Sequence, residues 1–331
     1  MLTLYYEARF GLARGAVFVA GRPHLYMEGL ETDPSQGLLG VHGIARLKGR
    51  GGGVAFLGLY DGSEAILDMP PQDLARLADG EAVEIVIAAE ARGDKLARAR
   101  LIRVAHGEAV RPLSPSLALK DRLLAEVRAC FGSVEIGVDE DSTAIDEAGD
   151  EALAPSPGMP GGGVLHIERT RALTACDVDG AGLTEARGKT NLRAVAEVVR
   201  RLRVMGLGGL FVVDLIGRRH DDKAIAGGLL AAFGAEAATI IPAPIGKFGT
   251  LEFVRPWRVC PTRDLPPALS QAGWLLREAT RQALHRPGRP LALRAPAGAL
   301  DIVRSRLMNS YDPLTPLLRL ETGPACEVIV P

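Results

Sequence analysis

Residues 207–216 read LGGLFVVDLI, the longest apolar run in the chain, interrupted near its end by a single carboxylate, Asp214. So short and apolar a run is typical of a central strand in a sheet, and it is too short to span a bilayer. Residues 191–205 before it predict a long helix. Residues 223–233 and 238–244 after it predict a second helix and another strand. The alternation of helix and strand predicts a layered α/β domain.

Two further strands are predicted upstream, at 164–170 (VLHIERT) and 174–180 (TACDVDG). Because side chains alternate along a strand, Asp177 and Asp179 face the same side. Ligands of α/β sheets bind beyond the carboxyl ends of strands, where Asp214 also lies. Such carboxylates suit Mg²⁺ or Mn²⁺, which keep several waters and bridge to phosphates. The alternative is that the aspartates cap turns at strand ends.

The flanking regions predict separate domains. Five short strands between residues 38 and 105 fit an OB-type barrel, often a binder of single-stranded nucleic acid, although any small β-barrel is an alternative. A helix is predicted over 117–130, with Ser116 as its N-cap. Residues 139–163, acidic and then rich in Pro and Gly, predict a solvated loop at a boundary. Residues 263–331 alternate helix and strand and predict a small α/β domain.

Composition narrows the class of protein. A chain of 331 residues can bury two or more cores. Its formal net charge of −1 gives no global attraction to nucleic acid or membranes, so local basic patches must hold any polyanion. Charges at Glu7, Arg9 and Arg14 argue against a signal peptide, and we expect a cytoplasmic protein. Neither a disulfide framework nor a zinc site is indicated by four widely spaced cysteines: Cys130, Cys176, Cys260 and Cys326.

Three stretches together resemble the core of the ribonuclease E/G family: GGGVLHIERTRALTACDVDGAG (161–182), KTNLRAVAEVVRRLRVMGLGGLFVVDLIG (189–217) and KFGTLEFVRPWR (247–258). The resemblance implies an α/β, multidomain fold with a deoxyribonuclease-I-like catalytic subdomain. It also implies an Mg²⁺-dependent endoribonuclease, in which water cleaves single-stranded RNA to leave 5′-phosphate and 3′-hydroxyl ends.

The resemblance also implies a division into four domains. A ribonuclease-H-like domain is built from residues 1–37 plus 106–160, and the OB-type barrel of residues 38–105 is inserted into it. The catalytic subdomain covers residues 161–262, and a small α/β domain covers residues 263–331.

The family's two metal-binding aspartates fall on Asp177 and Asp214, which are therefore predicted to hold Mg²⁺, with Mn²⁺ possible. The family usually has Asn two residues after the first aspartate, where this chain has Asp179. A third negative charge either weakens binding of the scissile phosphate or supplies another metal ligand. Asp177, Asp179 and Asp214 are the predicted catalytic residues.

Four residues match RNA-contacting positions of the family: Phe56, Lys95, Lys247 and Arg255. Three of them have a simpler alternative: a barrel-core side chain for Phe56, a solvated turn for Lys95 and a surface ion pair for Arg255. Ile66 replaces a second family aromatic, which removes a stacking face.

Two further groups of basic residues lie in the same region. Arg200, Arg201 and Arg203 are predicted to form the polar face of their helix. Arg218, Arg219 and His220 either extend a phosphate-binding surface or form a polar loop.

Two family features have no counterpart. No segment resembles the pocket that senses an RNA 5′-monophosphate, and Cys260 stands alone where the family's shared zinc link needs two thiolates. We therefore expect no zinc, and a monomer or a zinc-independent homodimer. A rival hypothesis is an RNA-binding relative with impaired catalysis, and a third, a deoxyribonuclease, rests on fold alone.

Overall fold

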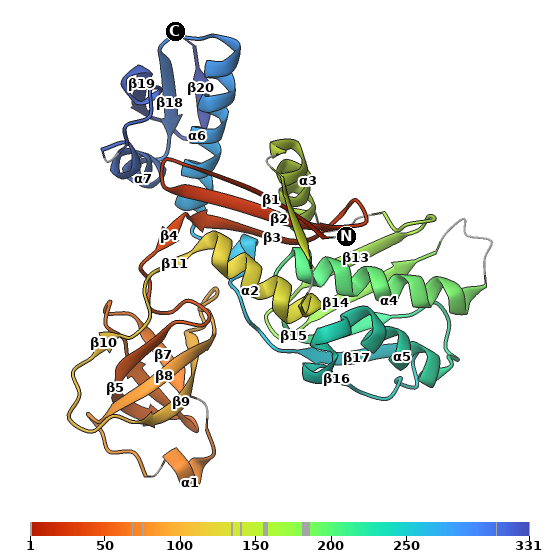
Figure 1. The fold of residues 1–331 in the computed structure, drawn as a ribbon. Helices are drawn as coiled ribbons and strands as arrows, with labels where there is room; N and C mark the ends of the chain where they lie inside the picture. The colour runs from red at the N-terminus through yellow and green to blue at the C-terminus, as the bar shows by residue number, and fades with distance from the viewer. Residues whose placement is uncertain are drawn as a thin grey trace.

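The computed structural model describes residues 2–67, 69–74, 76–133, 135–139, 141–154, 158–180, 186–308 and 310–330. A barrel, an α/β domain and a C-terminal domain lie around a central sheet (Figure 1). The central sheet has the strand order β12 (Ile136–Asp139), β1 (Leu2–Arg9), β2 (Leu12–Val19) and β3 (Arg22–Leu30). Strand β12 pairs parallel to β1, and the other pairs are antiparallel.

Helices cover both faces of the central sheet. Helix α2 (Leu119–Phe131) packs Leu123 and Val127 against Leu4 and Val17. It begins two residues later than predicted, and its N-cap is Ala118, which has no side-chain capping bond. On the other face, helix α3 (Ser142–Leu153) packs against Phe18 and Tyr26.

Helix α3 corrects the sequence analysis, which predicted a solvated loop there. Asp141 caps the helix by accepting a 2.8 Å hydrogen bond from the Thr143 amide. Ile145, Ala148 and Ala152 recur at helical spacing and are buried, so the acidic residues occupy only the other face. Residues 155–157 of the predicted loop lie outside the described residues.

The barrel contains the five predicted strands. They are β5 (His42–Gly51), β6 (Val54–Gly58), β7 (Glu64–Leu67), β8 (Ala82–Ala89) and β9 (Ala97–Val104). Their order is β5-β6-β7-β9-β8, and pairing of β5 with β8 closes the sheet around Leu47, Leu57 and Leu67. Closure fits the predicted OB-type barrel.

Short elements complete the barrel and connect it to the central sheet. Helix α1 (Pro71–Leu74) follows β7, and β10 (Arg111–Pro112) adds to β5. The chain enters and leaves the barrel through paired strands β4 (Thr32–Asp33) and β11 (Leu117–Ala118).

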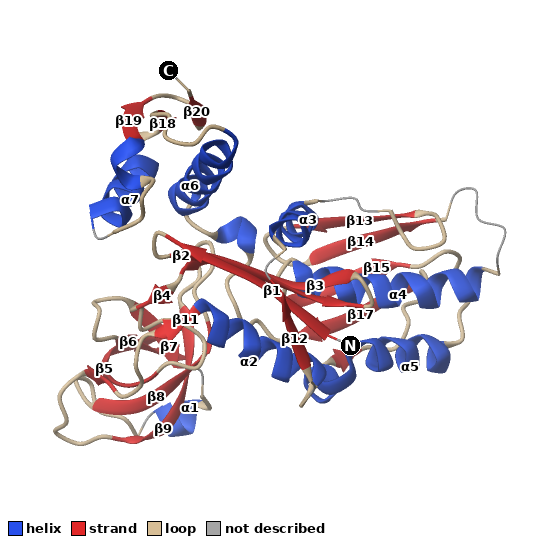
Figure 2. Cartoon of the chain, turned by 45° about the horizontal axis from the view of Figure 1, so that its top comes forward, coloured by secondary structure: helices blue, strands red, loops and turns tan. Residues whose placement is uncertain are grey.

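The α/β domain has the strand order β13 (Val164–Arg169), β14 (Thr174–Asp179), β15 (Gly209–Asp214), β17 (Thr250–Arg255) and β16 (Ile241–Pro242). The run that opened the sequence analysis forms the central strand, β15. Helices α4 (Arg187–Val204) and α5 (Asp222–Phe233) cover one face of this sheet (Figure 2). Every second side chain of the strands points toward these helices and packs with them in a hydrophobic core. The 3₁₀ helix η1 (Gly234–Thr239) follows α5.

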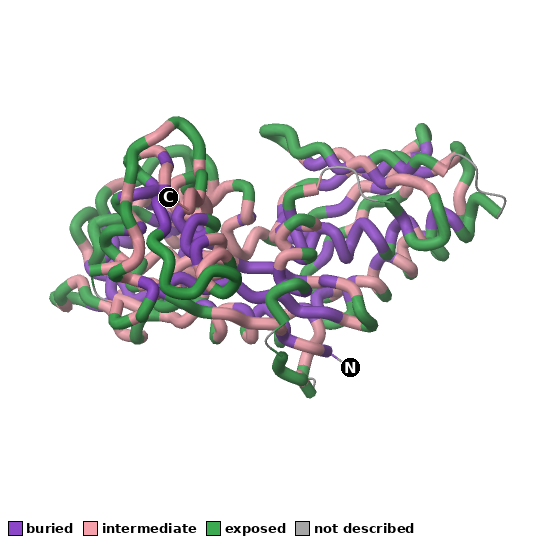
Figure 3. The backbone as a smooth tube through the Cα atoms, turned by 90° about the horizontal axis from the view of Figure 1, so that it is seen from above, coloured by how far each residue is buried: buried purple, intermediate pink, exposed green. Residues whose placement is uncertain are grey.

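The other face of this sheet is open. Leu210, Val254 and Ile241 lie side by side on it and are 39%, 38% and 68% exposed. The central strand is therefore buried on one face only, and its solvent-facing residues are available to a ligand. In the view of Figure 3, buried segments run through the interior of each part of the molecule, and the exposed segments are mostly loops.

The C-terminal domain stacks two helices on a small sheet. Helices α6 (Pro267–His285) and α7 (Ala297–Met308) pack on the sheet β19 (Leu318–Thr322), β18 (Leu291–Ala295), β20 (Glu327–Ile329). Strand β19 was not predicted. Two 3₁₀ turns, η2 (Thr262–Asp264) and η3 (Thr315–Leu317), precede α6 and β19. Phe10 and Leu12 of the central sheet join the core of this domain.

The arginines of α4 correct a second prediction. Arg200, Arg201 and Arg203 are 4%, 0% and 4% exposed rather than forming a solvated face. Arg200 ion-pairs with Glu197 and donates to the Pro23 carbonyl of β3, whereas Arg201 bonds the carbonyls that end α3. Helix α4 is thus held between its own sheet and the central sheet, and these three arginines are buried at that contact.

Candidate functional site

Two aspartates meet on the open face of the α/β sheet. Strands β14 and β15 are parallel and in register, so Asp177 is paired directly with Asp214. Both are exposed, and their side chains alternate with buried neighbours that face the helices. Adjacent strands lie about 4.8 Å apart, so the two carboxylates can share one ligand. Neither has an ion pair or hydrogen bond within the described residues.

The same row continues onto both neighbouring strands. His166 of β13 is paired with Asp177, and Thr250 of β17 is paired with Asp214. Neither residue was predicted from the sequence to neighbour the site. Alternation of His166 with buried Leu165 and Ile167 was visible in the sequence, but only the register of the strands puts the imidazole beside Asp177.

Asp179 lies on the same face, one side-chain position beyond the row. It is paired with Val164, and the pairing of β14 with β15 ends at Asp177 and Asp214. No group of three or more His, Cys, Asp or Glu side chains suited to a metal occurs within the described residues. The geometry therefore assembles a pair of carboxylates, with Asp179 at its margin.

A pair of adjacent, exposed carboxylates fits Mg²⁺ or Mn²⁺. These ions take oxygen ligands and are commonly bound through one or two carboxylates, with waters and substrate phosphates completing the coordination. A structural zinc site would need four nitrogen or sulfur ligands, which this row does not offer. Asp177 and Asp214 are the residues that would hold the ion.

Lys247 lies in the loop that leads into β17, close to the row. The loop is compact because Gly249 has a φ of 92° and its amide donates to the Gly246 carbonyl. A Cβ at Gly249 would lie 2.4 Å from the carbonyl oxygen of Gly217, so the loop is pressed against the segment that follows Asp214. Lys247 is exposed, as expected of a residue that contacts a phosphate.

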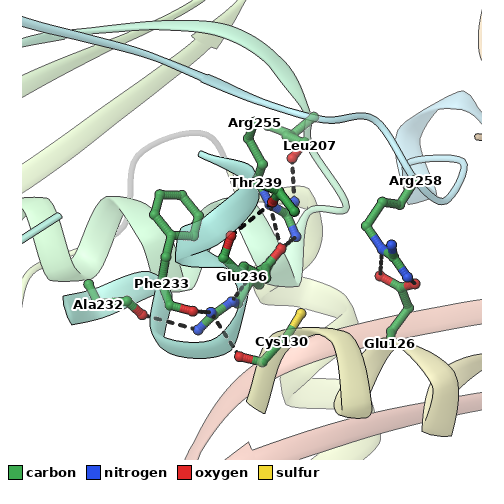
Figure 4. Close-up of polar contacts among 10 residues, drawn as sticks. Glu126, Cys130, Leu207, Ala232, Phe233, Glu236, Thr239, Arg255 and Arg258 are labelled. Atoms are coloured by element: carbon green, nitrogen blue, oxygen red, sulfur yellow. Dashed lines mark hydrogen bonds and ion pairs between the residues drawn. The ribbon is translucent and has the colours of Figure 1, made fainter. Parts of the chain in front are cut away.

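Arg255 does not reach the open face. It is 5% exposed, and its guanidinium pairs with Glu236 at 2.7 Å and donates to the Leu207 carbonyl at 2.5 Å (Figure 4). Glu236 also pairs with Arg203 at 2.6 Å. Arg255 therefore forms an ion pair, as its alternative interpretation predicted, but the pair is buried and not on the surface. Its guanidinium is not available to RNA on the open face.

We call the buried ion pairs the arginine–glutamate network: Glu151, Glu197, Glu236, Arg200, Arg201, Arg203 and Arg255. Burial raises the pKa of Glu236, but the charges and hydrogen bonds of Arg255 and Arg203 outweigh burial and hold it below its usual value. For Glu151, burial is likewise outweighed by Arg200 and Arg201.

Phe56 lies on the outside of the barrel. Its neighbours Ala55 and Leu57 point into the core, whereas Phe56 is half-buried and paired with Ile66. Ile66 is in turn paired with Arg98. The barrel-core alternative for Phe56 is therefore excluded, and one row on the outside of the barrel carries an aromatic, an aliphatic and a basic side chain.

Lys95 is exposed in the hairpin between β8 and β9, where it pairs with Asp94 at 3.6 Å. The same hairpin contacts the α/β domain. Arg92 lies 4.0 Å from the centre of the Trp257 ring, and Asp94 pairs with Arg171. These contacts fix the barrel beside the sheet that carries the aspartates.

No helix in the described ranges is both long and apolar enough to cross a membrane.

Comparison with known proteins identifies the region that holds both aspartates. Residues 134–258 match the model of the ribonuclease E/G family. Ribonuclease E of Escherichia coli (strain K12) is 39% identical over 106 residues, 29% of this chain and 10% of that protein. Ribonuclease E of Buchnera aphidicola subsp. Schizaphis graminum (strain Sg) is 36% identical over 114 residues, 32% of this chain and 12% of that protein.

Ribonuclease G of Haemophilus influenzae (strain ATCC 51907 / DSM 11121 / KW20 / Rd) is 26% identical over 143 residues, 34% of this chain and 29% of that protein. The chain thus covers only about a tenth of the two ribonuclease E relatives. The matched region contains the sheet, the paired aspartates and the loop of Lys247. The part of this chain that carries the paired aspartates, residues 134–258, thus matches the ribonuclease E/G family.

Proposed function

We propose that this protein is a metal-dependent endoribonuclease that cleaves single-stranded RNA, with water as the nucleophile, and leaves 5′-phosphate and 3′-hydroxyl ends. The observation that carries the proposal is the register of β14 and β15, which pairs exposed Asp177 with exposed Asp214. Membership of a ribonuclease family supplies the substrate class.

The two aspartates provide a negative site that a divalent cation neutralises. Mg²⁺, or Mn²⁺ in its place, would polarise a phosphoryl oxygen and make water a stronger nucleophile. Asp177 and Asp214 hold the ion at the sheet surface, and Lys247 attracts the RNA backbone beside it. Asp177 and Asp214 have no partner within the described residues, so no cation among these residues competes with the metal ion for them.

The barrel extends the RNA-binding surface. A base stacked on an aromatic ring contributes about 1–3 kcal/mol, and Phe56 presents its ring on the outer face. Lys95 lies in the hairpin that contacts the α/β domain, on a path from the barrel toward the aspartates. We propose that one strand of RNA follows this path.

The test is cleavage of an end-labelled single-stranded RNA with Mg²⁺, Mn²⁺ or EDTA. Cleavage with either ion, none with EDTA, and products with 5′-phosphate ends would support the proposal. Binding of the RNA without cleavage under all three conditions would favour the rival, an RNA-binding protein without catalysis. Asp179 favours that rival, because it adds a charge beside the scissile phosphate where the family usually has Asn.

Assembly and location complete the proposal: a cytoplasmic monomer, or a homodimer that needs no zinc. Light scattering with and without a chelator tests the assembly. Dissociation caused by the chelator would contradict it.

A further inference from the structure

A cavity of about 470 Å³ opens at the edge of the α/β sheet where β15 ends. It lies between the first turns of α4 and α5 and the segment that follows Asp214. Its wall includes Arg187, Asn191, Ile216, Arg218, Arg219 and His220. Because Ile216 is only two residues beyond Asp214, the cavity begins within about 7 Å of that residue along the chain.

Three arginines line this wall. Arg187, Arg218 and Arg219 are exposed and have no ion pair or hydrogen bond within the described ranges. Elsewhere in this domain, arginines such as Arg169, Arg200 and Arg203 pair with carboxylates at 2.6–2.7 Å. The cavity therefore concentrates positive charge that the described protein does not neutralise.

The loop that carries Arg218 and Arg219 is held in place from the side of α4. Asn191, which is fully buried, accepts from the Ile216 amide at 3.0 Å and donates to the Ile216 carbonyl at 3.2 Å. His220 contacts the Gly217 carbonyl through Nε2 at 2.9 Å and Asn191 through Nδ1 at 3.4 Å. In the Nε2–H tautomer, both histidine contacts are satisfied.

The loop is also held from the other side. The close approach of Gly249 to the Gly217 carbonyl leaves no room for a Cβ, so the loop of Lys247 abuts the arginine loop. Arg218 and Arg219 are thus presented on a segment fixed by contacts on both sides. A preorganised charge loses less entropy when it binds a ligand than a freely moving one does.

The one carboxylate of the cavity wall does not cancel this charge. Asp221 turns back onto α5, where its side chain accepts a 3.0 Å hydrogen bond from the Ala224 amide as the N-cap. At the start of α4, by contrast, the N-cap Ala186 makes no side-chain capping hydrogen bond. The wall has three arginines and one capping aspartate, which suits an anion.

We infer that this cavity binds a backbone phosphate of the RNA that neighbours the scissile phosphate, with Arg187, Arg218 and Arg219 as its ligands. Guanidinium groups bind phosphate oxygens in pairs of hydrogen bonds, which fixes the orientation of the strand as well as attracting it. The inference rests on the proposed function for the identity of the ligand. The cavity wall begins at Ile216, two residues beyond Asp214, so a phosphate held in the cavity would lie near the one that is cleaved.

The test is the salt dependence of single-stranded RNA binding in EDTA, measured by fluorescence anisotropy of a labelled oligonucleotide at several KCl concentrations. Each phosphate contact contributes about 0.7 to the slope of log K against log salt. Because the cavity holds one phosphate, we expect R218Q/R219Q to lower the magnitude of the slope by about 0.7 and to weaken binding. The matched control is R286Q/R289Q, which removes two exposed arginines from the C-terminal domain and should leave the slope unchanged.

Equal slopes for R218Q/R219Q and the parent, with both proteins folded by circular dichroism, would overturn the inference. An equal loss in R286Q/R289Q would overturn it too, because the effect would then be one of net charge. EDTA separates this test from the proposed function. Persistent cleavage by D177N would refute the metal site and leave the binding slope untouched.

Discussion

The α/β domain holds two sets of arginines with opposite environments. Those of the arginine–glutamate network are buried and paired with carboxylates, whereas Arg187, Arg218 and Arg219 line a cavity and have no partner within the described residues. A buried arginine without a carboxylate would be strongly destabilising, so the first set serves the fold. An exposed unpaired arginine costs the fold little and remains available to a ligand. The comparison predicts which substitutions affect stability and which affect activity.

The largest effect is expected from the exposed carboxylates. D177N or D214N should lower cleavage at least about a thousandfold, because losing a metal ligand removes several kcal/mol of transition-state stabilisation. Stability should be nearly unchanged, since neither residue is buried or paired within the described part of the chain. Gel assays of labelled RNA and thermal unfolding measure the two effects. A folded D177N that cleaves like the parent would contradict the metal assignment.

The network should give the opposite result. Glu236→Gln leaves Arg203 and Arg255 buried without a counter-charge, which should lower the free energy of unfolding by about 3–5 kcal/mol. Glu64→Gln is the matched control, because it removes an equivalent charge from an exposed pair with Lys48 and should cost less than about 1 kcal/mol. Urea unfolding compares them. Equal losses in the two variants would mean that burial does not distinguish the pairs.

The network also predicts acid sensitivity. The pKa of Glu236 is lowered in the folded state, so its stabilisation is present above the usual carboxyl pKa and is lost as the pH falls through the folded value. Burial, and then the charges of Arg200 and Arg203, lower the pKa of His24 to about 4. The unfolded state therefore binds the His24 proton more tightly between about pH 6.5 and 4. In this window the free energy of unfolding decreases as the pH decreases, by up to about 1.4 kcal/mol per pH unit.

His24→Phe tests the histidine contribution, because a ring is retained against Phe131 and the titrating group is removed. Its free energy of unfolding should vary less with pH between 6.5 and 4 than that of the parent. If the two proteins have the same pH dependence in this window, His24 is not responsible.

A smaller effect is expected at the margin of the site. Asp179→Asn should raise the Mg²⁺ concentration needed for half-maximal cleavage, because it removes a negative charge near the ion, yet preserve or increase the maximal rate. A titration of Mg²⁺ against rate separates the two quantities. An unchanged metal requirement would show that Asp179 does not contribute to ion binding.

The smallest expected effect is on the stability of the cavity variants. R218Q/R219Q should change the free energy of unfolding by less than about 0.5 kcal/mol, because exposed, unpaired side chains stabilise little. If R218Q/R219Q lost as much free energy of unfolding as Glu236→Gln, both sets of arginines would stabilise the fold, and the distinction between them would be wrong.

The local sequence pattern was sufficient to predict structural features that depend on the residues of a single segment. The apolar run at 207–216 predicted a central strand, and alternation predicted that Asp177 and Asp179 share a face. The five barrel strands followed from short apolar segments and turns. Helix α3 was missed because its acidic residues were given more weight than the buried stripe of Ile145, Ala148 and Ala152.

The sequence by itself determined which strands form and which residue types stand at their carboxyl ends, since these depend on periodicity and burial within one segment. Only the tertiary structure decided the register that pairs Asp177 with Asp214 and brings His166 beside them. The tertiary structure also decided which arginines are buried. Arg203 and Arg255 share one partner, Glu236, which lies in a different segment of the chain from either of them. Arg200 and Arg218 have the same side chain, and their roles differ because one faces a packed neighbouring sheet and the other a cavity.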